Sequence, residues 1–247
     1  MRSNILTPQA WLARSPLQTG ERLYLVVSAA SDADALKTLY QCESTPQLRP
    51  LWDGTPYSSW RPVMPYLAEL TVRSDVLDWI ANTDAQDWGW LAVSRSEPQV
   101  VFEHLRSLTQ VRMPDGTEVF FRFWDGRHLY PMLQKLGTEA GEILPVFDRY
   151  LINGKSLEVG PRAVPKAKDW PWWEIPQALL DALLEKDHSM VVDNLMQWLR
   201  EECAALFFAY PEDNLRGKVE RFVRQHPHTK DKAERLAAQL TKEVPHE

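Results

Sequence analysis

The sequence contains few cysteines and no long apolar run. Cys42 and Cys203 are the two cysteines among 247 residues, and they lie far apart, so we interpret them as reduced, partly buried thiols. The start of the chain does not read as a signal peptide, because Thr7, Pro8 and Gln9 interrupt it early. No window approaches the roughly 18 apolar residues of a spanning helix. We therefore expect a cytoplasmic protein without membrane insertion.

The sequence also lacks an excess of basic residues. It has 28 Lys and Arg against 34 Asp and Glu, which gives a formal net charge of −6. A protein that binds nucleic acid needs a basic face to neutralise phosphates, and this balance shows none. We therefore expect no nucleic-acid partner.

Linear motifs of catalysis are missing. The chain has no G-x-S-x-G elbow, no G-x-x-x-x-G-K-[ST] loop, no G-x-G-x-x-G, no C-x-x-C and no H-E-x-x-H. His226 and His228 have a metal-like spacing, but they straddle Pro227 without a third ligand nearby and read as a solvated loop. Cys203 lies in a helical run and reads as a small core residue rather than a nucleophile. We expect no catalytic residue, no metal and no cofactor; a hydrolase or transferase with a site assembled from distant side chains stays the alternative.

Apolar residues are abundant enough for a sizeable core, at 44% of the chain with 11 tryptophans. Strands are predicted for RLYLVVSAA, MPYLAELTV and WGWLAVS, helices for DADALKTLYQC, SDVLDWIANT and EPQVVFEHLRSL, and a hairpin for QVRMPDGTEVFFRFW. The later stretch LPVFDRYLING reads as irregular. This order predicts an α/β (α+β) lobe over residues 1–160, with a mixed sheet because a hairpin is present.

The second half of the chain has a different pattern. Residues 161–173 are rich in proline and tryptophan and predict a stiff connector. Apolar residues then recur at helical spacing without strand signals, in EIPQALLDALLEK, SMVVDNLMQWLREECAALFFAY, PEDNLRGKVERFVRQ and TKDKAERLAAQLTKE. We expect a smaller all-helical lobe over residues 174–247.

The stretch FFRFWDGRHL, residues 120–129, mixes aromatic and charged residues. A strand from Val119 to Trp124 would place Phe120 and Trp124 on one face. Asp125 then stands at the N-cap position of the helix that follows. Arg122 and Arg127 could pair with this carboxylate or serve a partner's carboxylate. We predict a structural corner, with an interaction surface as the alternative.

The chain from HLRSL to RHLYPML resembles the type VI secretion effector chaperones, also called adaptor (Tap or TEC) proteins. The family pattern is a helix ending in "hLr", a hairpin with "pdG" and the string "RfyDPr" before a helix. The matching residues are His104, Leu105, Arg106, Asp115, Gly116, Arg122, Phe123, Asp125 and Arg127. The resemblance covers roughly residues 21–150, and it departs from the pattern at Gly126, where the family usually has proline.

This resemblance implies a bacterial cytoplasmic adaptor without catalytic activity. Such a protein would bind a toxic type VI effector, through a segment near the effector's N-terminus, and help load it onto the VgrG spike protein. An effector or immunity protein from the same gene neighbourhood is a further alternative.

Three tryptophans near residue 170 are candidates for contact with the effector. Trp170, Trp172 and Trp173 lie within four positions at the start of the predicted helical lobe. Tryptophan is enriched among interface anchors, so at least one could line an apolar groove that takes an apolar helix. The alternative is that these indoles only hold the connector in place. Together with Arg122 and Arg127 they form the predicted partner-binding set, while Asp125, Asp115 and Gly116 are predicted to be structural.

Overall fold

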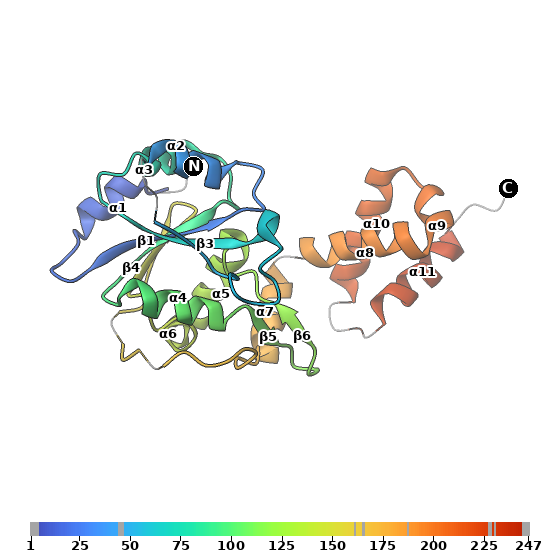
Figure 1. Ribbon diagram of the computed structural model, residues 1–247. Helices are drawn as coiled ribbons and strands as arrows, with labels where there is room; N and C mark the ends of the chain where they lie inside the picture. Colours follow the sequence, from blue (N-terminus) through green and yellow to red (C-terminus); the bar gives the residue numbers. More distant parts are fainter. Residues whose placement is uncertain are drawn as a thin grey trace. The chain divides into compact units, whose positions relative to one another are not determined.

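The computed structural model describes residues 5–43, 47–160, 162–164, 166–186, 188–226, 229 and 231–243. Its contacts divide the chain into two compact units, residues 1–176 and residues 177–247. Figure 1 shows an α/β arrangement for the first unit and helices for the second. The predicted connector, residues 161–173, falls within the first unit, and the division of the structure lies between Pro176 and Gln177.

A six-stranded sheet forms the centre of the first unit (Figure 1). Its strands are β1 (Arg22–Ser28), β2 (Leu48–Pro50), β3 (Pro65–Leu70), β4 (Gly89–Ser94), β7 (Arg149–Ile152) and β8 (Lys155–Glu158), in the spatial order β2-β3-β1-β4-β7-β8. The predicted α/β class is confirmed. The expected mixture of strand directions is not found, because every pairing between described strands of this sheet is antiparallel.

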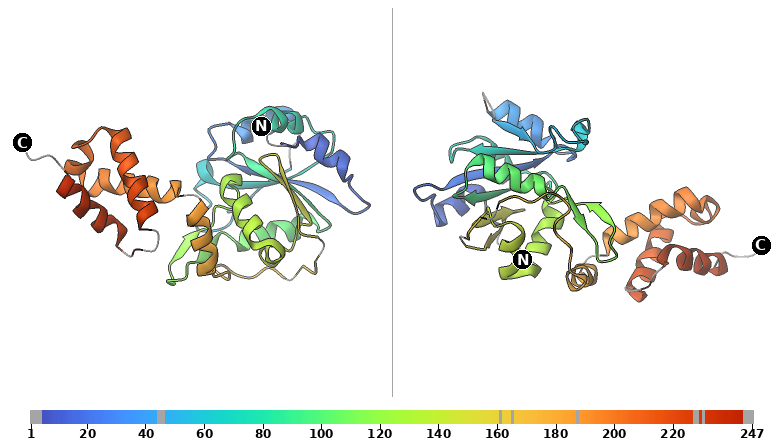
Figure 2. Two further views of the ribbon diagram at one scale, coloured as in Figure 1. Left: turned by 180° about the vertical axis from the view of Figure 1, so that it is seen from behind. Right: turned by 60° about the horizontal axis from the view of Figure 1, so that its bottom comes forward.

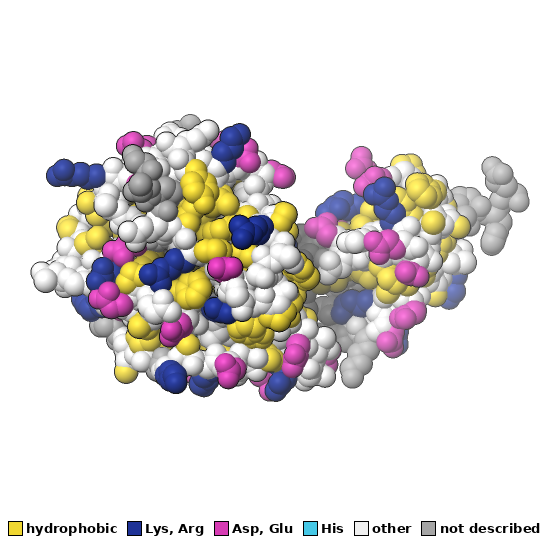
Figure 3. All heavy atoms as spheres, viewed as in Figure 1, with side chains coloured by type: hydrophobic (Ala, Val, Ile, Leu, Met, Phe, Trp, Pro, Cys, Tyr) yellow, Lys and Arg dark blue, Asp and Glu magenta, His cyan; other side chains and the backbone are white. Residues whose placement is uncertain are grey.

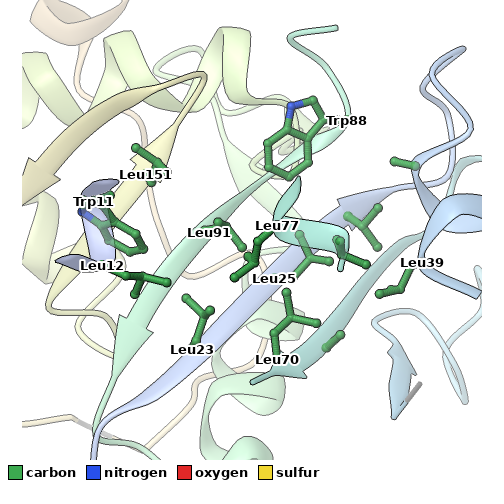
Figure 4. Packing of buried hydrophobic residues seen from close by; sticks show 14 of the residues in the cluster. Trp11, Leu12, Leu23, Leu25, Leu39, Leu70, Leu77, Trp88, Leu91 and Leu151 are labelled. Atoms are coloured by element: carbon green, nitrogen blue, oxygen red, sulfur yellow. The ribbon is translucent and has the colours of Figure 1, made fainter. Parts of the chain in front are cut away.

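The central strand β1 is buried along nearly its whole length, as its β-branched and apolar sequence predicts. Leu25 pairs with Ala68 of β3 on one side and with Leu91 of β4 on the other. Because side chains alternate along a strand, Leu23, Leu25 and Val27 point to one face of the sheet. Figure 4 shows that face, where Leu25 lies near Leu91 and Leu77 in a cluster that also contains Trp88.

Helices cover both faces of the sheet, which makes the first unit a three-layer structure (Figures 1 and 2). One face is covered by α1 (Pro8–Arg14), α2 (Ala35–Cys42) and α3 (Val76–Asn82), and the other by α4 (Pro98–Ser107), α5 (Gly126–Leu136) and α6 (Ala140–Ile143). On the second face Trp90 packs edge-on against Phe147, with 5.4 Å between ring centroids. The indole Nε1 of Trp90 donates a hydrogen bond of 2.8 Å to the carbonyl of Phe123, and so ties the sheet to the stretch before α5.

The predicted hairpin forms a separate two-stranded sheet of β5 (Gln110–Arg112) and β6 (Glu118–Phe120). The strand expected to reach Trp124 ends at Phe120. Backbone hydrogen bonds from Phe123 N to Phe121 O and from Asp125 N to Arg122 O turn the chain there, so it leaves the ladder.

A second hairpin, β7–β8, occupies part of the stretch that was expected to be irregular. Its turn is Asn153–Gly154, and both residues have positive φ, 50° and 70°. An Asn-Gly pair is a strong signal for the turn of a hairpin. The prediction missed this signal because the flanking strands are only four residues long.

The described part of the second unit is built from helices, as predicted. They are α7 (Gln177–Lys186), α8 (Ser189–Glu202), α9 (Ala204–Phe208), α10 (Glu212–Gln225) and α11 (Lys232–Glu243). Its core includes Leu199, Leu215, Val219 and Leu236, each at most 1% exposed. Cys203 lies between α8 and α9 rather than inside one helix, and it is half-buried beside this core.

Candidate partner-binding surface

Asp125 is the N-cap of α5, as the sequence predicts. Its Oδ1 accepts a hydrogen bond of 3.0 Å from the backbone N–H of Arg127, in the first turn of the helix. The Arg127 guanidinium donates two more, from Nε to Oδ1 at 3.1 Å and from Nη2 to Oδ2 at 2.8 Å. Arg122 Nη2 donates to Oδ2 at 3.2 Å. The carboxylate is therefore fully engaged within its own chain.

Asp125 is ionised in this setting although it is 1% exposed. Burial acts to raise the pKa of this carboxyl, but hydrogen bonds from Arg127 and the nearby His128 and Arg127 hold the pKa below its ordinary value. The Arg122 and Arg127 side chains are 51% and 48% exposed while they contact Asp125. Both guanidiniums thus keep surface that a partner could contact.

The departure from the family pattern at Gly126 has a local cause. A Cβ on this residue would lie 2.9 Å from Ile152 Cγ2 and 3.0 Å from Asn153 Nδ2, so these side chains would have to shift to make room for it. The β7–β8 turn therefore packs directly against the start of α5. Glycine avoids this crowding, and no positive φ calls for it at this position.

Five aromatic residues beside this corner form what we call the aromatic cluster. Its members are Trp52, Tyr57, Trp60, Phe120 and Trp124. Trp52 lies at the centre, with its ring 5.4 Å from that of Trp124 and 5.6 Å from that of Phe120. Tyr57 and Trp60 reach Phe120 at 4.8 and 5.3 Å. Such pairs are each worth about 0.5–1.5 kcal/mol beyond their burial, so the cluster is a rigid unit.

The aromatic cluster runs from the core to the surface. Trp52 is 2% exposed and Trp124 is 4% exposed, whereas Trp60 is 46% exposed and its neighbour Val63 is 41% exposed. Figure 3 shows hydrophobic side chains at the side of the first unit where Figure 1 draws β5 and β6. Arg61, between Trp60 and Val63, is exposed and has no ion pair within the described part of the chain. This edge offers an anchored apolar surface with a free cation.

Of the predicted tryptophans near residue 170, Trp172 contacts α4 and Trp173 contacts the hairpin. Trp172 Nε1 donates a hydrogen bond of 3.0 Å to Ser107 Oγ. The Trp173 ring lies 5.4 Å from that of Phe121, and its carbonyl accepts from the backbone N–H of Arg112 at 2.9 Å. Both indoles are half-buried, as is that of Trp170. Phe120 and Phe121 therefore contact two different aromatic groups, the aromatic cluster and Trp173.

Asp115 and Gly116 form the turn of the β5–β6 hairpin. Asp115 Oδ1 accepts a hydrogen bond of 2.9 Å from the N–H of Thr117, and Gly116 has a φ of +87°. A positive φ favours glycine, so the pair shapes the turn. His104, from the same motif set, is buried, and its Nε2 lies 2.7 Å from the carbonyl oxygen of Ile143. Burial lowers the pKa of His104 and keeps the imidazole neutral at pH 7.

The described residues contain no cluster of three or more His, Cys, Asp or Glu side chains that could hold a metal ion. His226 packs against the Phe222 ring at 4.8 Å, and His228 lies outside the described residues. No helix in the described part of the chain is long and apolar enough to cross a membrane.

The prediction from sequence did not identify Trp52, Tyr57 or Trp60 as part of a surface. A signal was present in the segment LWDGTPYSSW. This segment contains glycine and proline, which favour a turn, and three large aromatics lie within nine of its residues. Several large aromatics gathered in one loop segment can form a contiguous apolar patch, which marks candidate interaction sites.

Residues 23–141 match the family described as "Domain of unknown function (DUF4123)". The match contains the corner at Asp125 and the whole aromatic cluster. It ends before Trp170 and before the second unit. It agrees with the resemblance to type VI secretion effector adaptors that the motifs indicated, and that resemblance is confirmed.

One curated relative is "Accessory protein VasW" of Vibrio cholerae serotype O1. It is 30% identical over 153 residues, which cover 60% of this chain and 50% of that protein. The chain therefore spans about half the length of the curated relative it matches. No solved structure matches the chain significantly.

Proposed function

We propose that this protein is a non-catalytic adaptor of a bacterial type VI secretion system, acting in the cytoplasm. It binds an effector through a segment near the effector's N-terminus and helps load that effector onto the VgrG spike. The family match and the similarity to an accessory protein support this proposal. The aromatic cluster is the observation that carries it, because it lies within the matched residues and ends in an exposed apolar edge.

The edge made by Tyr57, Trp60 and Val63 suits the apolar face of a client helix. The rings of Trp52, Tyr57 and Phe120 contact Trp60 and hold it in place, so little side-chain entropy is lost when a partner binds. Arg61 and the half-exposed guanidiniums of Arg122 and Arg127 can then meet carboxylates at the rim. Trp170, Trp172 and Trp173 stay proposed contacts of the same client.

The test is co-expression of the full chain with the effector encoded beside its gene, followed by pull-down and titration. We expect Trp60→Ala to weaken client binding by tenfold or more, as for a central interface anchor of about 2 kcal/mol. Tyr40→Ala is the matched control, because Tyr40 is 57% exposed on α2 and lies outside the aromatic cluster.

The outcomes separate the function from the site. A folded Trp60→Ala variant that binds the client like the parent contradicts the site but leaves the adaptor function. A parent chain that neither binds the client nor increases its recovery with VgrG contradicts the function itself.

A further inference from the structure

The second unit carries an exposed apolar segment outside the DUF4123 match, the run CAALFFAY at residues 203–210. We call it the apolar ridge. Within it Ala204, Ala205, Phe208 and Ala209 are exposed, and Phe208 is 75% exposed, the highest value among the exposed large hydrophobic side chains of the described residues. Helix faces that contact water normally carry polar residues, and this one carries none.

The other side of the apolar ridge is anchored to the core of the second unit. Leu206, Phe207 and Tyr210 pack against that core, and the Tyr210 hydroxyl donates a hydrogen bond of 3.0 Å to the carbonyl of Leu240. The Phe207 ring meets that of Phe208 edge-on, with 5.3 Å between centroids. Phe208 is therefore presented on a fixed support. Figure 3 shows hydrophobic side chains on the second unit in the region where Figure 1 draws α9.

The small residues around Phe208 shape the surface. Ala204 and Ala205 lie one helical turn before Phe208, at i−4 and i−3, and so share its face. Because alanine side chains are short, another helix can approach the backbone of α9 closely on either side of the phenyl ring. The surface is a low platform with one aromatic knob, which suits a helix whose apolar face offers a hole for that ring.

Acidic residues border the apolar ridge at both ends. Glu201 and Glu202 end α8, while Glu212 and Asp213 begin α10. All four are exposed, and none has an ion-pair partner within the described part of the chain. Among the nearby cations, Arg216 and Lys218 are paired with Asp193 and Glu243 respectively. Lys218 also lies over the Tyr210 ring, 5.2 Å from its centroid. The exposed Arg200 precedes Glu201, so the four carboxylates at this border outnumber the cations there.

We propose that the apolar ridge binds an amphipathic helix of a partner protein, one with an apolar face and Lys or Arg on its flanks. The charge pattern selects this occupant. A second copy would bring the same carboxylates against each other, and an anionic membrane surface attracts basic rather than acidic borders. The site is separate from the aromatic cluster, whose free cation favours acidic partners, so it does not depend on the proposed client surface.

The test uses the full chain and two labelled synthetic peptides, each an amphipathic helix of about five turns. Both carry the same leucine face; one has Lys on its flanks and the other has Glu at the same positions. Fluorescence anisotropy should show binding of the Lys peptide, at least tenfold tighter than that of the Glu peptide. Raising the salt from about 0.05 M to about 0.5 M should weaken this binding, because the flanking charges are solvent-exposed.

Three variants locate the interaction. Phe208→Ala should weaken binding of the Lys peptide by tenfold or more, while Tyr40→Ala, which removes an exposed aromatic of the first unit, should not change it. Ala205→Arg is a second test at an exposed position. It places a bulky cation on the platform, so it should also abolish binding of the Lys peptide. Circular dichroism checks that each variant keeps its helices.

Several results would overturn the proposal. Equal binding of the two peptides, or unchanged binding by folded Phe208→Ala and Ala205→Arg, would show that the apolar ridge does not select a basic helix. A concentration-dependent dimer that Phe208→Ala abolishes would assign the ridge to a second copy of the chain. Binding to phosphatidylglycerol vesicles that the same variant abolishes would assign it to a lipid surface.

Discussion

Replacing Asp125 by alanine removes the N-cap of α5 and the common acceptor of two arginines. The cap is worth about 1 kcal/mol. The ion pairs to Arg122 and Arg127 add about 0.5 kcal/mol each, because half-exposed guanidiniums are screened by water. We therefore expect Asp125→Ala to lower the free energy of unfolding of the first unit by about 2 kcal/mol. Asp125→Asn keeps an oxygen for the cap and should lose about half as much.

Tryptophan fluorescence can follow this change in the intact chain. Trp198 is the single tryptophan beyond residue 176, so the signal comes mainly from the first unit. Urea denaturation at pH 7 gives the difference between parent and variant. The sign of the pH dependence follows from the lowered pKa of Asp125. Its contribution is present above the unfolded pKa of about 3.9 and is lost as the pH falls through the folded value, so the two proteins should converge in acid.

One pattern would refute this reasoning. If Asp125→Ala unfolds at the same urea concentration as the parent but no longer binds the client, the carboxylate serves the partner and not the helix. Loss of both stability and binding, with both partly restored in Asp125→Asn, is the expected result for a structural cap.

Further predictions concern glycine, histidine and tryptophan positions. Gly126→Ala should destabilise the first unit by about 1–3 kcal/mol in thermal unfolding, because its Cβ meets Ile152. Gly217 lies on α10 with open space around it, so Gly217→Ala should stabilise the second unit by up to about 1 kcal/mol in the same assay. The pKa of His104 is lowered in the folded protein, so its contribution to stability should be constant above the unfolded pKa of about 6.5 and should decrease as the pH falls below that value. His104→Gln should reduce this pH dependence in urea denaturation. Trp172→Ala should lower the stability of the first unit by about 1–3 kcal/mol by leaving Ser107 without its indole donor. If this variant melts like the parent and loses client binding in pull-down, Trp172 acts at the interface instead.

Local chemistry decided several features that could be predicted from the sequence. The Asp125 cap, the Asp115–Gly116 turn and the buried strand β1 depend on residues a few positions apart, and short-range steric and hydrogen-bonding rules govern them. The separation of Phe120 and Phe121 onto two sides of the hairpin follows from strand alternation in the same way.

Tertiary structure alone decided the candidate surface. Trp52 follows β2 and Trp124 precedes α5, and they meet only because these distant segments pack together in the fold. Gly126 shows the same limit, since the reason for glycine is the approach of Ile152 from β7. Contacts between distant segments depend on the order of strands and on which helix covers which face. The repeat of apolar residues every two or every 3.6 positions predicts a strand or a helix, but it carries no information about strand order or about which face a helix covers. The sequence therefore determined the elements and their caps, and the packing of distant segments determined the candidate surface.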